Sequence, residues 1–165
     1  MKDLPTQITP LISVIIPTLN EETVIRSTLE TLNQATKTSD VEVIVVDGGS
    51  KDRTIEQASL LARVIISLPG RARQMNLGAS FASGQILLFL HADTFLPPNA
   101  FQLMQQTLVS PRYCGGCFRH ALDHTGIYYR LISQMSNLRA RWPCLLYTSD
   151  AADDTPCVDL GGRRI

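Results

Sequence analysis

The fold is decided by the stretch Gln85–Pro98, QILLFLHADTFLPP. Its apolar run Ile86–Leu90 shows no polar alternation, which is typical of a strand covered on both faces in a parallel sheet under helices. The run ends abruptly at His91-Ala92-Asp93. In parallel sheets, ligands bind beyond the carboxyl ends of the strands, and a carboxylate there can hold a cation that holds phosphate oxygens. The alternative is that Asp93 only forms a turn before the two prolines.

On either side of this run, strand-like and helix-like segments alternate four times along the chain. The short connections between them predict an α/β domain with a mostly parallel sheet, and right-handed crossovers place helices on both faces. We expect Ile86–Leu90 to be the central strand. The other strands are expected over Leu11–Ile16, Val41–Val46 and Arg63–Ser67, and the helices from Asn20 to about Gln34, from Asp52 to Leu61 and from Arg71 to Ser83.

Helix ends and helix faces can also be predicted. Asn20 and Ser50 are expected as N-caps, because their side chains accept hydrogen bonds from the first turn of a helix. In the helix from Arg71 to Ser83, apolar spacing predicts which side packs on the sheet. The expected packing stripe is Ala72, Met75, Ala79 and Ala82, with Arg71, Gln74 and Gly78 on another face.

Three further elements are expected downstream. A helix over Asn99–Ser110 would pack through Phe101, Met104 and Leu108. We then expect a strand over Gly115–Leu122, which would add a second wall to the site, and a helix over Gly126–Trp142.

Composition excludes several classes of function. The 165 residues include 15 basic and 15 acidic side chains, so there is no bulk electrostatic case for binding nucleic acid. No stretch approaches the ~18–20 apolar residues of a membrane-spanning helix. The first apolar run is short and closed by Pro17, so no signal peptide is expected. We expect a cytoplasmic protein, which a lipid-linked substrate could bring to the membrane surface as a peripheral protein.

The four cysteines favour a reduced compartment over a disulfide framework. Only Cys114 and Cys117 have metal or redox spacing. A zinc site would need a second pair, and a thiol redox site would need a following helix. Since Phe118–Leu122 has the pattern of a strand, small residues lining a strand explain this pair better.

Polar segments follow three of the expected strands: Pro17–Glu21, Asp47–Asp52 and His91–Asp93. The carboxyl ends of parallel strands meet at one edge of a sheet, so these segments should gather in one crevice. Gly48 and Gly49 would allow a tight turn and close approach of the backbone to a ligand.

Four motifs, PTLNEE, VVDGGSKDRT, GRARQMNLGA and LLFLHADTFLP, occur in this order between about Ile12 and Trp142. Together they resemble the inverting family 2 glycosyltransferases with a GT-A fold. The GRARQMN and HADT forms are most similar to the radical-SAM and selenoprotein-associated transferase subgroup. The resemblance implies an enzyme that moves a sugar from a nucleoside diphosphate donor, expected to be UDP-linked, to a hydroxyl acceptor with inversion.

The resemblance also implies a donor site. Asp47 and the loop after the first strand would hold base and ribose, since a carboxylate can accept the ring N–H of uracil. Arg71 and Arg73 lie where the family contacts the donor, and a guanidinium matches phosphate oxygens, although either residue could be a solvated helix arginine. The implied donor-binding residues are Pro17, Thr18, Asn20, Glu21, Asp47, Gly48, Gly49, Asp52, Arg71, Arg73, Asn76, His91 and Ala92.

His91-Ala92-Asp93 occupies the position of the family's Asp-x-Asp metal motif, with His in place of the first Asp. By resemblance, Asp93 would bind Mg²⁺ or Mn²⁺ that bridges the diphosphate and offsets charge on the leaving group. His91 is either a second ligand or a histidine hydrogen-bonded at a strand end. The family's catalytic base is an Asp or Glu beyond the acceptor-side helix, and we expect it to be missing from this chain.

The last segment, Cys144–Ile165, has neither helical nor strand period and resembles translated sequencing-library adapter. The alternative is a native disordered tail. We therefore expect a C-terminally truncated glycosyltransferase domain over residues 1–143, and a tail over 144–165 outside the family pattern. The fragment could then be inactive.

Two rival functions remain at this point. One is a nucleotide-sugar-binding fragment without turnover. The other is a nucleotidyltransferase, which would normally carry a glycine- and basic-rich loop where PTLNEE stands. A dinucleotide-binding dehydrogenase is disfavoured, because no GxGxxG follows the first strand.

Overall fold

The computed structural model describes residues 12–36, 40–108, 115–118 and 134–135. The backbone falls into two compact units, Met1–Arg112 and Tyr113–Ile165. In the second unit, residues 115–118 are exposed and form no strand, so the predicted strand over Gly115–Leu122 is wrong in its described part. Gln134 and Met135 are helical. The predicted domain limit at residue 143 lies outside the described residues.

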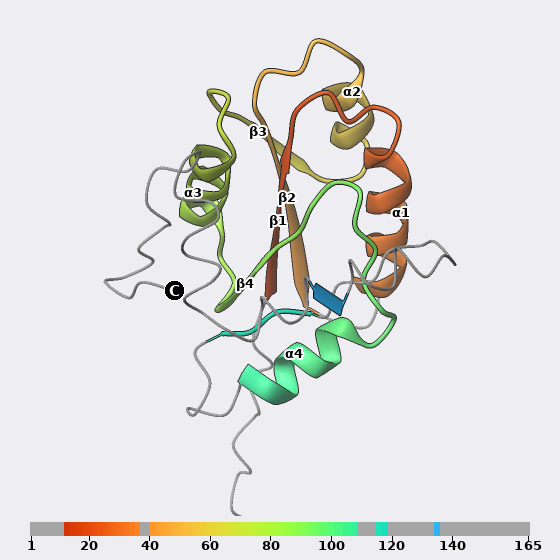
Figure 1. Cartoon of the computed structure of the whole chain (residues 1–165), viewed down its shortest axis with the longest axis vertical. Helices are drawn as coiled ribbons and strands as arrows, with labels where there is room; N and C mark the ends of the chain where they lie inside the picture. The colour runs from red at the N-terminus through yellow and green to blue at the C-terminus, as the bar shows by residue number, and fades with distance from the viewer. Residues whose placement is uncertain (1–11, 37–39, 109–114, 119–133, 136–165) are drawn as a thin grey trace, which may run out of the picture. The chain divides into compact units, whose positions relative to one another are not determined.

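The first unit contains a four-stranded parallel sheet (Figure 1). This confirms the predicted α/β class. The strands are β1 (Ile12–Thr18), β2 (Val41–Asp47), β3 (Arg63–Ile66) and β4 (Ile86–Phe89), in the spatial order β3-β2-β1-β4.

The prediction that Ile86–Leu90 forms the central strand is wrong for the described sheet. β4 lies at its edge and pairs only with β1 there, while β1 and β2 are central. Residues 87–89 are accordingly half-buried, whereas the apolar residues of β1 from Ile12 to Ile16 are fully buried. An unbroken apolar run thus indicated a parallel strand correctly without fixing its place in the sheet.

Four helices cover the two faces of this sheet, as predicted: α1 (Ile25–Thr36), α2 (Thr54–Ser59), α3 (Arg71–Phe81) and α4 (Ala100–Leu108). Leu29 of α1, Ala58 of α2 and Phe101 of α4 share a core with Val14 and Val45 of the sheet. Leu77 and Ala79 of α3 pack on the opposite face, and Figure 1 shows α3 across the sheet from α1 and α2. No helix of the described residues is long and apolar enough to cross a membrane.

The packing stripe predicted for α3 is confirmed at Ala79 and at Ala82, just after the helix, which both pack on the sheet. The helix also buries residues that were predicted to lie on another face. Its buried residues are Gln74 and Gly78. A Cβ atom on Gly78 would lie 2.4 Å from Cγ2 of Ile15 and 3.0 Å from Cγ2 of Val46, so only glycine allows α3 to approach the sheet this closely. Apolar spacing missed this face because it consists of an amide and a glycine.

The predicted N-caps are also wrong. α1 begins at Ile25, five residues after Asn20, and α2 begins at Thr54, four residues after Ser50. Asn20 has a φ of 58°, in the left-handed region that asparagine tolerates better than most residues. The side chains of Asn20 and Ser50 instead link two loops at the carboxyl edge of the sheet.

Candidate functional site

Three polar segments gather at the carboxyl edge of the sheet. Thr18 pairs with Asp47 in the parallel register of β1 and β2, and the N–H of Leu90 donates to the carbonyl of Ile15, 3.0 Å away. The structure therefore places Asp47 and Asp93 at the same edge, as expected. Burial and the charges of Asp93 and Asp52 raise the pKa of Glu21, so acidic groups from all three segments lie near one another.

Asp47 was expected to contact the base of the donor, but in the structure its carboxylate bonds to its own turn. Its side chain is fully buried. One carboxylate oxygen accepts the N–H groups of Gly49 at 2.8 Å and Ser50 at 2.7 Å. The other accepts the hydroxyls of Ser50 at 2.5 Å and Thr18 at 3.1 Å. Four donors fill the acceptor capacity of a carboxylate, which leaves none open for the N–H of a nucleobase. Asp47 thus shapes the turn.

The loops after β1 and β2 are joined by reciprocal hydrogen bonds; we call Asn20–Glu22 and Gly48–Thr54 the paired loops. The N–H of Asn20 donates to Oγ of Ser50 at 2.8 Å, and the N–H of Lys51 donates to Oδ1 of Asn20 at 2.9 Å. Ser50 therefore connects Asn20 to the Asp47 carboxylate. The turn uses Gly49 at a φ of 92°, which confirms the predicted role of a glycine here.

A second reciprocal set continues the paired loops. The N–H of Glu22 donates to Oδ2 of Asp52 at 3.2 Å, and the N–H of Arg53 donates to Oε2 of Glu22 at 3.0 Å. The N–H of Glu21 donates to the Thr54 hydroxyl at 2.8 Å. Desolvation opposes ionisation of Asp52, but hydrogen bonds from Thr54 and Glu22 outweigh it and lower the pKa of Asp52. The loops are thus joined before any ligand binds.

Gln74 links α3 to both central strands, although it was predicted to lie on a face that does not pack on the sheet. Its Nε2 donates to the carbonyls of Thr18 and Val46, each at 2.8 Å, and the residue is 4% exposed. A Cβ on Gly48 would come within 3.1 Å of this amide, so glycine lets the turn lie against it. A glutamine directly after Arg73, in the first turn of the helix, was the available signal.

The turn after β4, His91–Thr94, carries the predicted metal-binding residue. The N–H of Thr94 donates to the carbonyl of His91 at 3.2 Å. Ala92 is buried, whereas His91 and Asp93 are exposed. The guanidinium of Arg71 is hydrogen-bonded to Nε2 of His91. This contact supports the hydrogen-bonded alternative for His91, and it brings the predicted donor-binding Arg71 to the turn.

Three further predicted donor-binding residues lie on α3 and β1. Arg73 and Asn76 are exposed on α3, and Pro17 is half-buried near the end of β1. Of the cysteine pair, Cys117 is a free, exposed thiol, and Cys114 lies outside the described residues.

The fit of a divalent ion can be judged from these groups. In the part of the chain that the structure describes, no three His, Cys, Asp or Glu side chains could enclose an ion together. Asp93 nevertheless offers an exposed carboxylate, the hard oxygen ligand that Mg²⁺ and Mn²⁺ prefer. The donor set fits an ion held by one or two carboxylates plus phosphate oxygens and water.

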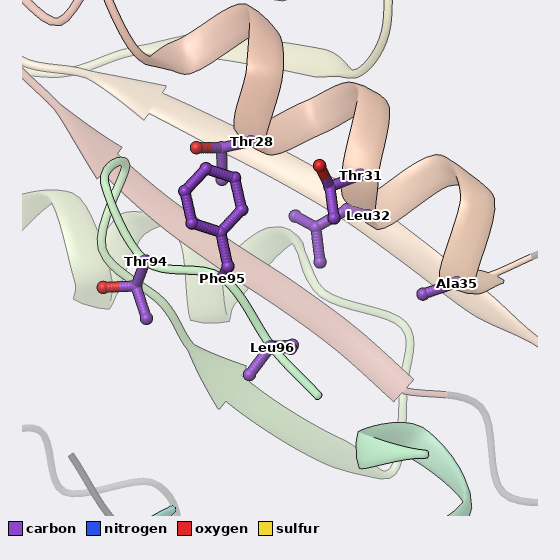
Figure 2. A pocket seen from close by; sticks show the side chains of 7 residues that line it. All are labelled: Thr28, Thr31, Leu32, Ala35, Thr94, Phe95 and Leu96. Atoms are coloured by element: carbon purple, nitrogen blue, oxygen red, sulfur yellow. The ribbon is translucent and has the colours of Figure 1, made fainter. Parts of the chain in front are cut away.

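A small crevice lies behind the turn, between α1 and the segment that follows Asp93 (Figure 2). Its volume of about 10 Å³ leaves room for one water molecule at most. It cannot hold a nucleotide. Its lining residues are Thr28, Thr31, Leu32, Ala35, Thr94, Phe95 and Leu96.

Fold and site together define an α/β protein with a candidate ligand site at the carboxyl edge of its sheet. The model of glycosyl transferase family 2 matches residues 13–155, and the chain belongs to this family. The match extends past residue 143, where we expected the family pattern to end. Family membership sets aside the nucleotidyltransferase alternative.

Two relatives show the range of this similarity. A PGL/p-HBAD biosynthesis glycosyltransferase of Mycobacterium bovis is 40% identical over 95 residues, which make up 53% of this chain and 37% of the relative. A 4,4'-diaponeurosporenoate glycosyltransferase of Staphylococcus haemolyticus is 33% identical over 117 residues, 65% of this chain and 31% of the relative. The chain thus spans well under half the length of these relatives.

Solved structures confirm the GT-A type of fold. Glucosyl-3-phosphoglycerate synthase from Mycobacterium tuberculosis, in complex with Mn²⁺, uridine diphosphate and glucosyl-3-phosphoglycerate, matches with a TM-score of 0.54 and 29% identity. The match covers 61% of this chain and 40% of that one. The same synthase in complex with Mg²⁺ and uridine diphosphate matches with a TM-score of 0.53.

Proposed function

We propose that this chain carries the donor-binding part of an inverting glycosyltransferase that moves a sugar from a UDP-linked donor to a hydroxyl acceptor. One observation supports this most: Asp93, Arg71 and the paired loops lie at one edge of a parallel sheet. The similar synthase was solved with Mn²⁺ and uridine diphosphate, which supports the same kind of ligand here. Membership of the radical-SAM-associated subgroup, with a lipid-linked acceptor at the membrane surface, is part of the proposal.

The paired loops would form the nucleoside side of the site. Asp47, Asn20 and Asp52 contribute through loop shape, because their side chains are bonded within the paired loops. The Glu22 carboxylate is likewise bonded within these loops, to the N–H of Arg53. The Glu21 carboxylate accepts no hydrogen bond from the described residues. The Glu21 side chain is therefore available to the base and ribose.

Asp93 would hold Mg²⁺ or Mn²⁺ against the diphosphate, with the exposed guanidinium of Arg71 beside it. The ion supplies Lewis-acid stabilisation of the charge that builds on the departing nucleoside diphosphate. Arg71 adds a planar cation that matches phosphate oxygens. Arg73, Asn76, His91 and Ala92 complete the proposed donor side.

A second candidate is nucleotide-sugar binding without turnover. It is supported by the proposed donor-side groups, which lie together at the carboxyl edge of the sheet, whereas turnover would also require a base that takes the proton of the acceptor hydroxyl. We assign no catalytic base among the residues that the structure describes. An adapter-like tail over residues 144–165 stays a prediction, because the family match extends to residue 155.

Titration calorimetry with uridine diphosphate, with and without Mn²⁺, tests the proposal beside an assay of donor hydrolysis. Mn²⁺-dependent binding is expected, and binding without hydrolysis would favour the second candidate. Absence of Mn²⁺-dependent binding would contradict both.

Asp93→Ala is expected to lower donor hydrolysis about a hundredfold or more, equivalent to about 3–4 kcal/mol. Where hydrolysis is absent, the same substitution should abolish the Mn²⁺ dependence of binding. Asp40→Ala is the matched control, because Asp40 is an exposed carboxylate just before β2, at the opposite edge of the sheet. Unchanged behaviour of Asp93→Ala would remove Asp93 from the mechanism.

A further inference from the structure

We propose that Thr28 of α1 is a positioning residue for Asp93, which sets the geometry of the metal-binding turn from outside the site. This inference rests on the proposed function of Asp93. The hydroxyl of Thr28 donates to the carbonyl of Ala92 at 2.6 Å, across 64 residues of sequence. Thr28 is 1% exposed and Ala92 is 4% exposed, so this bond is shielded from water.

The bond acts on the peptide group that leads into Asp93. A peptide group is planar, so holding the Ala92 carbonyl fixes the plane that carries the N–H of Asp93. In a turn over His91–Thr94, closed by the bond from Thr94 to His91, this is the central peptide. Turns of type I and type II differ by a flip of that peptide.

The backbone of Asp93 agrees with one of these two states. Type II requires a positive φ at the third residue of the turn, which here is Asp93. Among the described non-glycine residues only Asn20 has a positive φ. The Thr28 bond thus holds the peptide between Ala92 and Asp93 in the orientation that agrees with the negative φ of Asp93. Without this bond, the peptide could flip to the other orientation.

Other contacts hold the turn at different points. The bond from Leu90 to Ile15 ends the pairing of β4 before the turn begins. Arg71 contacts the side chain of His91, not the peptide next to Asp93. Thr28 therefore links α1 to the backbone directly before Asp93.

The same crevice offers a matched control. Thr31 lies one turn further along α1 and lines the crevice beside Thr28, with the Phe95 ring facing this pair of threonines (Figure 2). Its hydroxyl donates to the carbonyl of Ser27 within the helix, at 2.9 Å. Thr31→Val therefore makes the same chemical change without touching the turn.

The experiment uses the full chain and four variants: Thr28→Val, Thr28→Ala, Thr28→Ser and Thr31→Val. In calorimetry at saturating uridine diphosphate, loss of the hydroxyl should raise the apparent Kd for Mn²⁺ about five- to tenfold. The Kd for uridine diphosphate without metal should change less than about twofold. A general loss of structure would weaken both kinds of binding, so this contrast separates the two explanations. Thr28→Ser should restore the wild-type value, and Thr31→Val should keep it.

Hydrogen exchange of the metal-free protein gives a second readout. The Thr94 amide should exchange faster in Thr28→Val and Thr28→Ala, while the Gly49 and Ser50 amides keep wild-type rates. Unchanged Thr94 exchange, or an equal loss of both binding modes, would overturn the inference. Wild-type chain without Mn²⁺-dependent binding would instead overturn the proposed function, and Thr94 exchange would still report whether Thr28 holds the turn.

Discussion

The paired loops and the turn after β4 lie at the same edge of one sheet but are held in different ways. In the paired loops, backbone N–H groups of both loops donate to side chains of the other loop. The turn at His91–Thr94 has one internal backbone bond and a long bond of 3.4 Å from the Thr94 hydroxyl to the Asp93 carboxylate. It also has the contact of Arg71 with His91 and the link from Thr28. The proposed nucleoside side is thus built in advance, whereas the backbone next to Asp93, the proposed metal ligand, depends on few contacts.

The difference follows from where the polar side chains lie. Asn20, Ser50, Asp52 and Thr54 are residue types that commonly satisfy backbone groups locally. Here they satisfy backbone groups of a neighbouring loop, which removes the freedom of both segments. Asp93 is exposed, and no donor from another segment reaches its carboxylate within the described residues. A carboxylate that must meet a metal ion has to remain open in this way.

The largest test makes the same change in each region. Asp47→Ala removes a fully buried carboxylate and leaves the donors of Gly49, Ser50 and Thr18 without a partner. We expect it to lower the free energy of unfolding by about 3–5 kcal/mol. Asp93→Ala removes an exposed carboxylate and should change stability by less than about 0.5 kcal/mol. Urea unfolding of both variants, read from the midpoint and slope, measures the difference.

Equal effects of Asp47→Ala and Asp93→Ala on stability would contradict the idea that the two regions are held in different ways. A chain with Asp47→Ala that keeps wild-type stability would show that the Gly49–Ser50 turn does not need the buried carboxylate. Asp40→Ala, at the opposite edge, controls for removal of any exposed aspartate.

The sequence predicted the sheet and its polar edge because both follow from local patterns. Apolar runs and short connections indicated parallel strands, and their order placed Asp47 and Asp93 at one edge. The partners of Asn20 and Ser50 could not be predicted in this way. Their side chains fit the first turn of a helix equally well, and only the approach of two distant loops decides between these uses.

The buried face of α3 escaped prediction for a related reason. Gln74 is buried because two strand carbonyls, those of Thr18 and Val46, happen to face it. Gly78 is buried because the helix lies too close to Ile15 for any larger side chain. Periodicity counts apolar residues, so it cannot find a face that consists of hydrogen bonds and close approach.

A second test uses the other end of β2. Glu42 accepts hydrogen bonds from the Ser13 hydroxyl at 2.5 Å, from the Ser83 N–H and hydroxyl at 2.6 and 2.7 Å, and from the Gly84 N–H at 3.2 Å. Burial alone would raise the pKa of Glu42, but these donors outweigh it and lower the pKa. Glu42→Gln should therefore lower stability by about 1–2 kcal/mol at neutral pH without affecting ligand binding.

The pH dependence follows from the direction of that shift. Because the pKa of Glu42 is lower in the folded than in the unfolded protein, its contribution is complete above its ordinary value of 4.5. It is lost as the pH falls through the lowered value in the folded protein. Urea unfolding of the variant and wild type should thus converge in acid. Glu56→Gln, an exposed glutamate of α2, is the control, and a gap that stays constant with pH would contradict the prediction.

The smallest expected effect on stability concerns Glu21, the residue of the paired loops whose charge is affected by Asp93 of the turn. Burial, then Asp93, then Asp52 raise the pKa of Glu21, so its charged form is disfavoured in the folded protein. The cost is complete at pH values above the raised pKa and disappears as the pH falls below the ordinary value of 4.5. Glu21→Gln should therefore stabilise the metal-free chain by a few tenths of a kcal/mol, roughly, at neutral pH and not in acid.

A double-mutant cycle with Asp93→Asn assigns this gain. If repulsion between Glu21 and Asp93 causes part of the gain in stability, Glu21→Gln should stabilise the Asp93→Asn chain less than the wild-type chain. Thermal unfolding of the four proteins at neutral and acidic pH measures the coupling. An identical gain in both backgrounds would mean that burial and Asp52 disfavour the Glu21 charge without Asp93, and that the paired loops and the turn are electrostatically independent in the metal-free protein.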